Sequence, residues 1–175
     1  NKYGYINSKG TYVINPQFDY AADFAENGLA CVEQDNKYGY INSKGTYVIN
    51  PQFGSAYDFA ENGLACVAQG GKYGYIDSKG TFVINPQFDF ADDFAENGLA
   101  CVEQGDKWGY INSKGTYVIN PQFDSALDFA ENGLARVAQG YKWGYINSKG
   151  AIAIEPQFDY AYDFAENGLA CVEQG

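Results

Sequence analysis

The chain repeats one 35-residue sequence five times, and this periodicity constrains its fold more than any other feature. The copies begin at Asn1, Asn36, Gly71, Asp106 and Tyr141 and follow one another without insertion or deletion. A fixed period of about 20–50 residues is typical of repeat proteins, in which neighbouring copies bury one another's apolar faces. We therefore predict one repeat domain over residues 1–175, made of the repeats 1–35, 36–70, 71–105, 106–140 and 141–175.

Each copy has the pattern of three short strands. In the first copy, residues 2–7 alternate as a strand does, and residues 8–10 end in a glycine suited to a hairpin turn. Residues 11–15 form a second strand rich in β-branched and aromatic side chains, which Pro16 is expected to end. Residues 29–34 form the third strand, which turns directly into the next copy. Three strands therefore make an antiparallel meander in each copy.

The segment 18–27 is the one part of each copy with helical spacing, because Phe18, Ala21 and Phe24 are three residues apart. We expect it to form a loop with one helical turn, closed by Gly28. The predicted fold class is therefore all-β: a tandem array of five 35-residue, three-stranded antiparallel meanders in an open, twisted, β-solenoid-like array. A closed five-fold ring that resembles a propeller is the alternative.

Comparison of the five copies gives a map of expected burial. Nine of the positions that do not change are assigned to the core; in the first copy they are Ile6, Ile14, Phe18, Ala21, Phe24, Gly28, Leu29, Ala30 and Val32. One position accepts any kind of side chain and is therefore expected to be exposed; it holds Ala22, Tyr57, Asp92, Leu127 and Tyr162. Another position holds Cys31, Cys66, Cys101 and Cys171 but Arg136 in the fourth copy, which predicts that these thiols face outward.

Charge and composition exclude several classes of function. The net charge is −11, and a polyanion repels the phosphate backbone of nucleic acids. No apolar run is long enough for a transmembrane helix, so we expect no membrane insertion. The chain has no histidine, which removes the commonest general base and most zinc sites. The carboxylates recur in equivalent settings instead of the unlike pair that acid–base catalysis needs. We therefore predict no catalytic residues, no metal, no cofactor and no enzyme activity.

Two repeated features could still bind a ligand. The carboxylates of Asp19, Asp23 and Glu26 could coordinate Ca²⁺, but their spacing is not that of an EF-hand loop, and capping of the loop is the preferred interpretation. A periodic aromatic row could stack on sugar rings, although packing between copies is the preferred interpretation. This row consists of Tyr3, Tyr38, Tyr73, Trp108 and Trp143.

Each copy has a combined motif that reads Lys-aromatic-Gly-Tyr-Ile, then a turn with glycine, then a strand that ends in Pro-Gln-Phe. This motif resembles the bacterial WG repeat, also called the KWG repeat. The Trp-Gly pair that names the family stands here as Trp108-Gly109 and Trp143-Gly144, and tyrosine replaces the tryptophan in the other three copies. The resemblance covers the whole chain and implies a repeat scaffold without catalytic or ligand residues that could be transferred.

These observations favour a non-catalytic structural or interaction scaffold that presents a repeated surface to a protein partner or to further copies of itself. It could be part of a longer array or of an extracellular fibre. The alternative function is a carbohydrate-binding surface module that uses the Tyr/Trp row. The cysteines are at least 35 residues apart, too far to suggest a metal motif, and their redox state and the compartment stay open.

Overall fold

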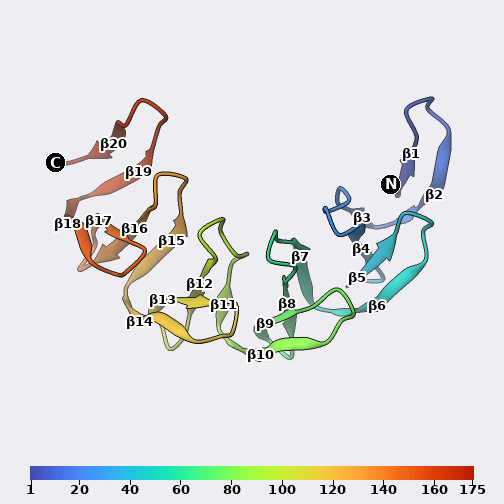
Figure 1. The fold of residues 1–175 in the computed structure, drawn as a ribbon, viewed down its shortest axis with the longest axis horizontal. Helices are drawn as coiled ribbons and strands as arrows, with labels where there is room; N and C mark the ends of the chain where they lie inside the picture. Colours follow the sequence, from blue (N-terminus) through green and yellow to red (C-terminus); the bar gives the residue numbers. More distant parts are fainter. The chain divides into compact units, whose positions relative to one another are not determined.

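The computed structural model describes all 175 residues, and every regular element in it is a β-strand (Figure 1). The strands form four four-stranded antiparallel sheets and two two-stranded sheets. No helix has the length and apolar character needed to span a bilayer. The chain divides into two compact units, Asn1–Gln87 and Phe88–Gly175.

The first ten strands are β1 (Tyr3–Ile6), β2 (Tyr12–Phe18), β3 (Tyr20–Ala21), β4 (Leu29–Gln34), β5 (Lys37–Asn42), β6 (Tyr47–Phe53), β7 (Ser55–Phe59), β8 (Ala65–Gln69), β9 (Lys72–Ile76) and β10 (Phe82–Phe88). The other ten are β11 (Phe90–Ala91), β12 (Leu99–Glu103), β13 (Trp108–Asn112), β14 (Tyr117–Phe123), β15 (Ser125–Phe129), β16 (Leu134–Gln139), β17 (Lys142–Asn147), β18 (Ile152–Phe158), β19 (Tyr160–Phe164) and β20 (Ala170–Glu173).

Each complete sheet joins the end of one copy to the start of the next. The sheet β3-β4-β5-β6 takes β3 and β4 from the first copy and β5 and β6 from the second. The turn at Asp35 and Asn36, both with positive φ, lets β4 pair directly with β5. The prediction of three-stranded meanders was therefore wrong in strand number, because the segment expected to contain a helical turn supplies a fourth strand, β3.

The strands at the two ends of the chain form half-sheets. One half-sheet is β1-β2, which corresponds to β5-β6 of a complete sheet, and the other is β19-β20, which corresponds to β3-β4. No pairing joins β20 to β1, so the strand pairing contains no closed ring, the alternative derived from the sequence.

Pro16 does not end the second strand, contrary to the sequence prediction. Strand β2 continues through it to Phe18, and the pairing with β1 shifts register between Tyr3 and Tyr5, opposite this proline. A Cβ on Gly4 would lie 2.5 Å from the Ile14 carbonyl oxygen and 2.6 Å from the Pro16 nitrogen. The glycine therefore lets the bulged backbone of β2 approach β1, and the bulge accommodates a residue that cannot donate to the ladder.

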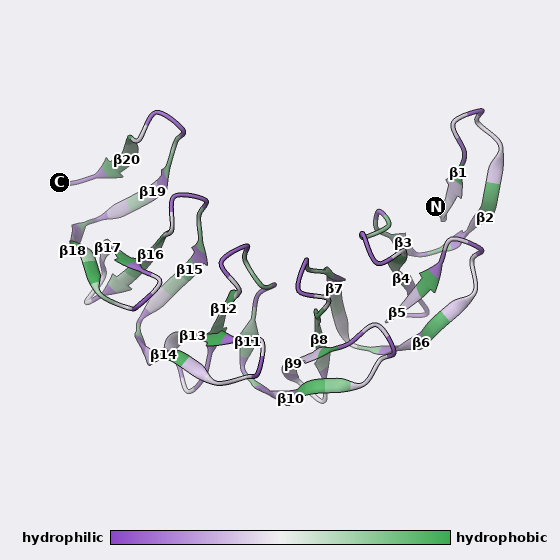
Figure 2. Cartoon of the chain, in the orientation of Figure 1, coloured by the Kyte–Doolittle hydropathy of each residue, from purple (hydrophilic) through white to green (hydrophobic).

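The core lies between consecutive sheets. In the first unit, Leu29, Tyr40 and Phe53 of one sheet pack against Phe59 and Val67 of the next, and all five side chains are buried. Figure 2 shows hydrophobic colour along strands such as β5 and β10 and hydrophilic colour at the turns. Because each sheet contributes one face to such a core, stacking of neighbours supplies the burial that a single copy lacks.

Two positions assigned to the core from the sequence are exposed in the first copy. Gly28 lies in a turn with a φ of 77° and recurs because the turn requires positive φ. Ile6 is 60% exposed, whereas its equivalent Ile41 is fully buried. The difference follows from the half-sheet, in which β1 has no strand on its other side.

The prediction that the cysteines face outward was wrong for three of the four copies. Cys31, Cys66 and Cys101 are buried, and Cys171 is exposed on the terminal strand β20. The Cys31 thiol donates to the Ala56 carbonyl of the next sheet at 3.6 Å. In the fourth copy, the Arg136 guanidinium donates instead to the carbonyl of Ala161 at 2.9 Å and to the carboxylate of Asp163 at 3.0 Å. A long side chain thus reaches the same acceptor position and an exposed carboxylate beyond it.

Candidate functional site

The aromatic row lies near one end of each sheet, where the first residue of the Trp-Gly or Tyr-Gly pair faces two neighbouring strands. Tyr38 on β5 stands opposite Glu33 on β4 and Phe53 on β6. Trp108 on β13 has the equivalent neighbours Glu103 and Phe123. The row residues are half-buried except Tyr3, which is exposed. They are Tyr3, Tyr38, Tyr73, Trp108 and Trp143.

A second aromatic position connects the members of the row. The ring of Tyr20 lies 6.1 Å from that of Tyr3 and 6.4 Å from that of Tyr38, measured between centroids. In the second unit, Phe90 lies 5.6 Å from Trp108, and Trp143 lies 5.7 Å from Tyr160. These distances are within the range of favourable aromatic pairs. The rings therefore pack against one another within a sheet and between neighbouring sheets.

This second position alternates along the chain, which the sequence analysis did not detect. It is aromatic in the first, third and fifth copies and serine in the other two: Tyr20, Ser55, Phe90, Ser125 and Tyr160. The residue opposite it on the next strand alternates in step: Glu33, Ala68, Glu103, Ala138 and Glu173. Comparison of the copies at these two positions would have revealed a 70-residue period.

A hollow of about 570 Å³ accompanies the small residues of the second copy. It lies between the sheet β3-β4-β5-β6 and the following sheet, and Ser55 and Ala68 are in its wall. The other lining residues are Lys37, Gln52, Gly54, Gln69, Gly70, Gly71 and Tyr73.

At the same end of the sheets, other copies have an ion pair between a lysine and an aspartate. The ammonium groups of Lys2 and Lys107 lie 2.6 and 2.5 Å from the carboxylates of Asp19 and Asp124, and Lys142 pairs with Asp159. Each aspartate also accepts a backbone N–H from the turn that precedes the next copy's first strand; the donors are Asp35, Gly140 and Gly175. These contacts lower the pKa of all three aspartates, with the lysine hydrogen bond as the largest cause.

The variable position predicted to be exposed is half-buried in four copies. Ala22, Tyr57, Asp92 and Leu127 have intermediate exposure, and only Tyr162 is exposed. The backbone carbonyl here accepts a hydrogen bond from a tyrosine of the preceding sheet that recurs in every copy, for example from Tyr40 to Tyr57 at 2.6 Å and from Tyr110 to Leu127 at 2.7 Å. Because the backbone makes this contact, the side chain is free to vary.

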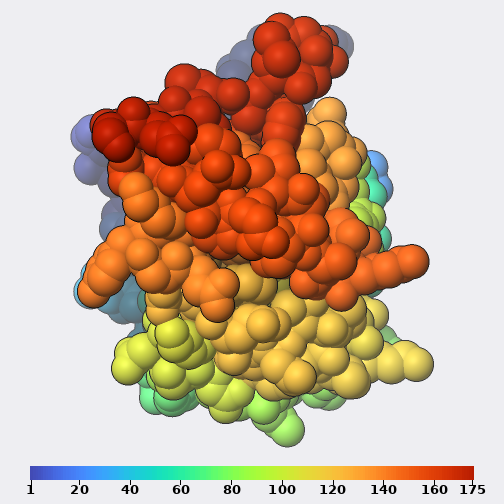
Figure 3. Space-filling model, turned by 90° about the vertical axis from the view of Figure 1, so that its left-hand side faces the viewer, coloured from blue at the N-terminus to red at the C-terminus, as the bar shows by residue number.

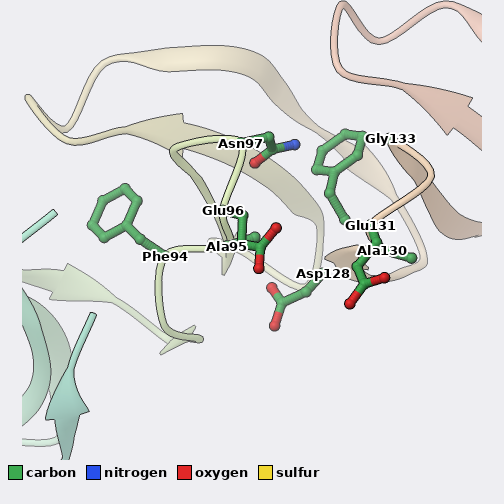
Figure 4. A pocket seen from close by; sticks show the side chains of 9 residues that line it. Phe94, Ala95, Glu96, Asn97, Asp128, Ala130, Glu131 and Gly133 are labelled. Carbon is green, nitrogen blue, oxygen red and sulfur yellow. The ribbon is translucent and has the colours of Figure 1, made fainter. Parts of the chain in front are cut away.

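The acidic loops form a second type of hollow. In the second unit it has a volume of about 610 Å³, and the carboxylates of Glu96, Asp128 and Glu131 surround it (Figure 4). Burial, with the charges of Asp92 and Asp93, raises the pKa of Asp128 to about 7. In the first unit, Asp23, Glu26, Asp58 and Glu61 line an equivalent hollow.

These carboxylates do not form a metal centre. The 175 described residues contain no group of three or more His, Cys, Asp or Glu side chains placed to hold an ion. Asp19 lies elsewhere, in the ion pair with Lys2, so the structure does not bring together the three residues Asp19, Asp23 and Glu26 that were considered for Ca²⁺. The hollows can accept hydrogen-bond donors and cations but offer no basic group of their own among their lining residues.

A family model described as "WG containing repeat" matches residues 3–38, 38–73, 73–108, 108–143 and 143–175, nearly the whole chain. The chain belongs to this WG repeat family. Each match begins at a residue of the aromatic row, so the WG repeat and the 35-residue copy begin on the same strand. No curated protein matches the WG repeat chain in sequence.

Several solved structures resemble the chain at low sequence identity, and two of them reach a TM-score of 0.50. The structure of Kluyveromyces lactis Hsv2p is 13% identical, with a TM-score of 0.50, over 89% of this chain and 51% of that chain. A variant of the same protein, with loop 6CD replaced by a Gly-Ser linker, is 14% identical, with a TM-score of 0.50, over 71% and 46%. The hemopexin fold protein CP4 from cow pea is 15% identical, with a TM-score of 0.34, over 91% and 92%. The WG repeat chain spans about half the length of the first two structures.

Proposed function

We propose that this WG repeat chain is a non-catalytic interaction scaffold whose two half-sheets are completed by complementary strands of further WG repeats, which other copies of the chain can supply. The observation that carries the proposal is their complementarity. The half-sheet β19-β20 corresponds to the first two strands of a complete sheet, and β1-β2 corresponds to the last two. Together, β19-β20 of one molecule and β1-β2 of another would make one complete four-stranded sheet.

Exposure of apolar side chains supports this association. Leu169 is 70% exposed and Val172 is 39% exposed, whereas the equivalent residues Leu29 and Val32 are buried. The segment near the end of the chain, in dark red, lies at the surface in Figure 3. An unpaired strand edge flanked by exposed apolar residues is a template for pairing with another chain.

We take the register of the proposed contact from that of the complete sheets. In the sheet of β4 and β5, Cys31 pairs with Tyr40, Val32 with Gly39 and Glu33 with Tyr38. In the same register, Cys171 of one molecule would lie opposite Tyr5 of the next, and Glu173 opposite Tyr3. Two different surfaces meet in such a contact, so repetition produces a closed ring of molecules or an open filament.

Sedimentation over a wide range of protein concentrations tests the proposal. The wild-type mass should rise with concentration, and Ile6→Lys should stay monomeric, because a charge on β1 faces the position where β20 would dock. Val13→Lys is the matched control: Val13 is also exposed, but so are its equivalents Val48, Val83 and Val118 within complete sheets. It should associate as the wild type does. A wild-type chain that stays monomeric at every concentration would contradict self-association.

A further inference from the structure

The second copy lacks the aspartate of the lysine–aspartate ion pair that other copies have. Gly54 stands where Asp19, Asp89, Asp124 and Asp159 stand. The backbone is nevertheless the same, because the N–H of Gly54 donates to the Ala68 carbonyl at 2.9 Å, as that of Asp124 donates to the Ala138 carbonyl at 2.9 Å. Only the carboxylate is missing from an otherwise equivalent position.

The second copy therefore lacks the carboxylate acceptor that binds two hydrogen-bond donors in the other copies. In other copies one carboxylate binds both the lysine ammonium and the backbone N–H of the turn, as Asp124 binds Lys107 and Gly140. Their equivalents in the second copy are Lys37 and the N–H of Gly70, which have no carboxylate from residue 54. A Cβ on Gly54 would have only the Ala68 oxygen nearby, at 3.8 Å, so the space is open to a ligand.

The surrounding hollow is large enough for a ring. Its volume is about 570 Å³, and Ser55 and Ala68 occupy positions that are aromatic and glutamate in the neighbouring sheet. Tyr73 contributes an aromatic ring to the wall. The hydroxyl of Ser55 and the side-chain amides of Gln52 and Gln69 add neutral hydrogen-bonding groups. A few polar groups beside an aromatic ring are typical of small-molecule sites.

We propose that this hollow binds the hexuronic-acid residue of an acidic glycan. The sugar carboxylate occupies the position that an aspartate carboxylate has in the other copies, between the Lys37 ammonium and the Gly70 N–H. The sugar ring lies against Tyr73, and its hydroxyls bond to Gln52, Ser55 and Gln69. The net charge of −11 disfavours a ligand with several negative charges, so we expect neutral sugars on either side of the uronic acid.

Calorimetric titration with methyl β-D-glucuronide, and with methyl β-D-glucoside as the uncharged analogue, tests this site. The wild type should bind one glucuronide and bind the glucoside at least about tenfold more weakly, because a charge-assisted hydrogen bond is lost. Gly54→Asp should abolish glucuronide binding, because the new carboxylate takes both donors. Gly54→Ala should retain it. Gly54→Asp restores the residue type of four other copies, so a loss of binding cannot be attributed to misfolding.

A gain of binding provides the converse test. The fourth copy has the same small residues, Ser125 and Ala138, beside Trp143, but Asp124 fills the carboxylate position. Asp124→Gly should therefore create a second site and double the stoichiometry of glucuronide binding.

Three outcomes would overturn the assignment. They are an absence of glucuronide binding to the wild type, undiminished binding to Gly54→Asp, and equal affinity for acetate and glucuronide. The last outcome would mean that the site binds a carboxylate but does not recognise the sugar. None depends on the mass measured by sedimentation, so this site and self-association can fail independently.

Discussion

At the scale of single residues, Tyr40 shows how one side chain connects two neighbouring sheets by packing and by a hydrogen bond. It is fully buried, its hydroxyl donates to the Tyr57 carbonyl at 2.6 Å, and its ring lies 4.9 Å from that of Phe59. Tyr110 and Phe129 repeat the arrangement in the second unit, with centroids 4.8 Å apart. The contact combines apolar burial with satisfaction of a carbonyl that would otherwise lie between two sheets.

This contact predicts unequal effects of two nearby substitutions. Phe59→Ala should lower the free energy of unfolding by about 3–5 kcal/mol, because it removes a buried aromatic ring between sheets. Tyr57→Ala should cost about 1 kcal/mol or less, since its backbone carbonyl, which remains, makes the hydrogen bond to Tyr40. Urea denaturation of the two variants checks this. Equal losses would show that the ring of Phe59 is not central to the packing.

The raised pKa of Asp128 predicts a stability that falls as pH rises. The folded protein holds this proton up to about pH 7, whereas an unfolded aspartate releases it near pH 4. Between these values the folded state binds more protons, so the free energy of unfolding decreases with increasing pH. Asp128→Asn should remove part of this slope and raise the melting temperature at pH 8.

Asp124→Asn is the control of opposite sign. The pKa of Asp124 is lowered by Lys107, so its contribution is present at neutral pH and is lost as pH falls. Melting temperatures of both variants and the wild type at pH 5 and pH 8 measure the two slopes. A melting temperature of Asp128→Asn that tracks the wild type at every pH would contradict the raised pKa.

The residues that the sequence predicted wrongly have identifiable physical causes. Constancy among the five copies correctly marked Phe18, Ala30 and Val32 as buried. It misassigned Gly28, which is constant because of its positive φ. Tolerance of Arg136 wrongly suggested an outward-facing site for Cys31, because a flexible guanidinium can leave a buried position and reach Asp163. A position can therefore stay constant, or accept a different residue, for reasons other than the burial of its side chain.

At the scale of elements, a glycine and a proline in each WG repeat lie close together and accommodate the bulge between two strands. A Cβ on Gly39 would lie 2.6 Å from the Ile49 carbonyl oxygen and 2.7 Å from the Pro51 nitrogen. Alternation and residue type predicted both strands but not this bulge, because proline usually ends a ladder. The bulge became evident only from the register of β5 and β6, which shifts between Tyr38 and Tyr40.

The close approach predicts a sharp difference between two glycines that are near in sequence. Gly39→Ala should destabilise the protein by more than about 2 kcal/mol, because backbone atoms of β6 would have to move. Gly54→Ala should change stability by less than about 0.5 kcal/mol, since its new Cβ meets nothing closer than 3.8 Å. Thermal denaturation distinguishes the two. A Gly39→Ala variant as stable as the wild type would mean that the bulge is easily rearranged.

At the scale of the whole molecule, the 35-residue period predicted an all-β repeat fold in which neighbouring copies bury one another's apolar faces. It did not predict where one sheet ends and the next begins, because a copy can be divided at either of two turns without changing the sequence pattern. Each sheet spans a copy boundary, because the chain passes to the next sheet at a single residue after the long strand, such as Asp19 between β2 and β3. That placement is what leaves complementary half-sheets.

A register-specific disulfide tests self-association most directly. With Cys171 replaced by serine, Tyr3→Cys and Glu173→Cys would stand opposite each other if β20 pairs with β1 as β4 pairs with β5, and directly opposed residues lie within reach of a disulfide. Oxidation should then produce a ladder of covalent oligomers on non-reducing gels, whereas a variant with only one of the two new cysteines should give dimers at most, because Cys31, Cys66 and Cys101 are buried. A double variant that stays a free-thiol monomer, or that forms its disulfide within one chain, would contradict the account.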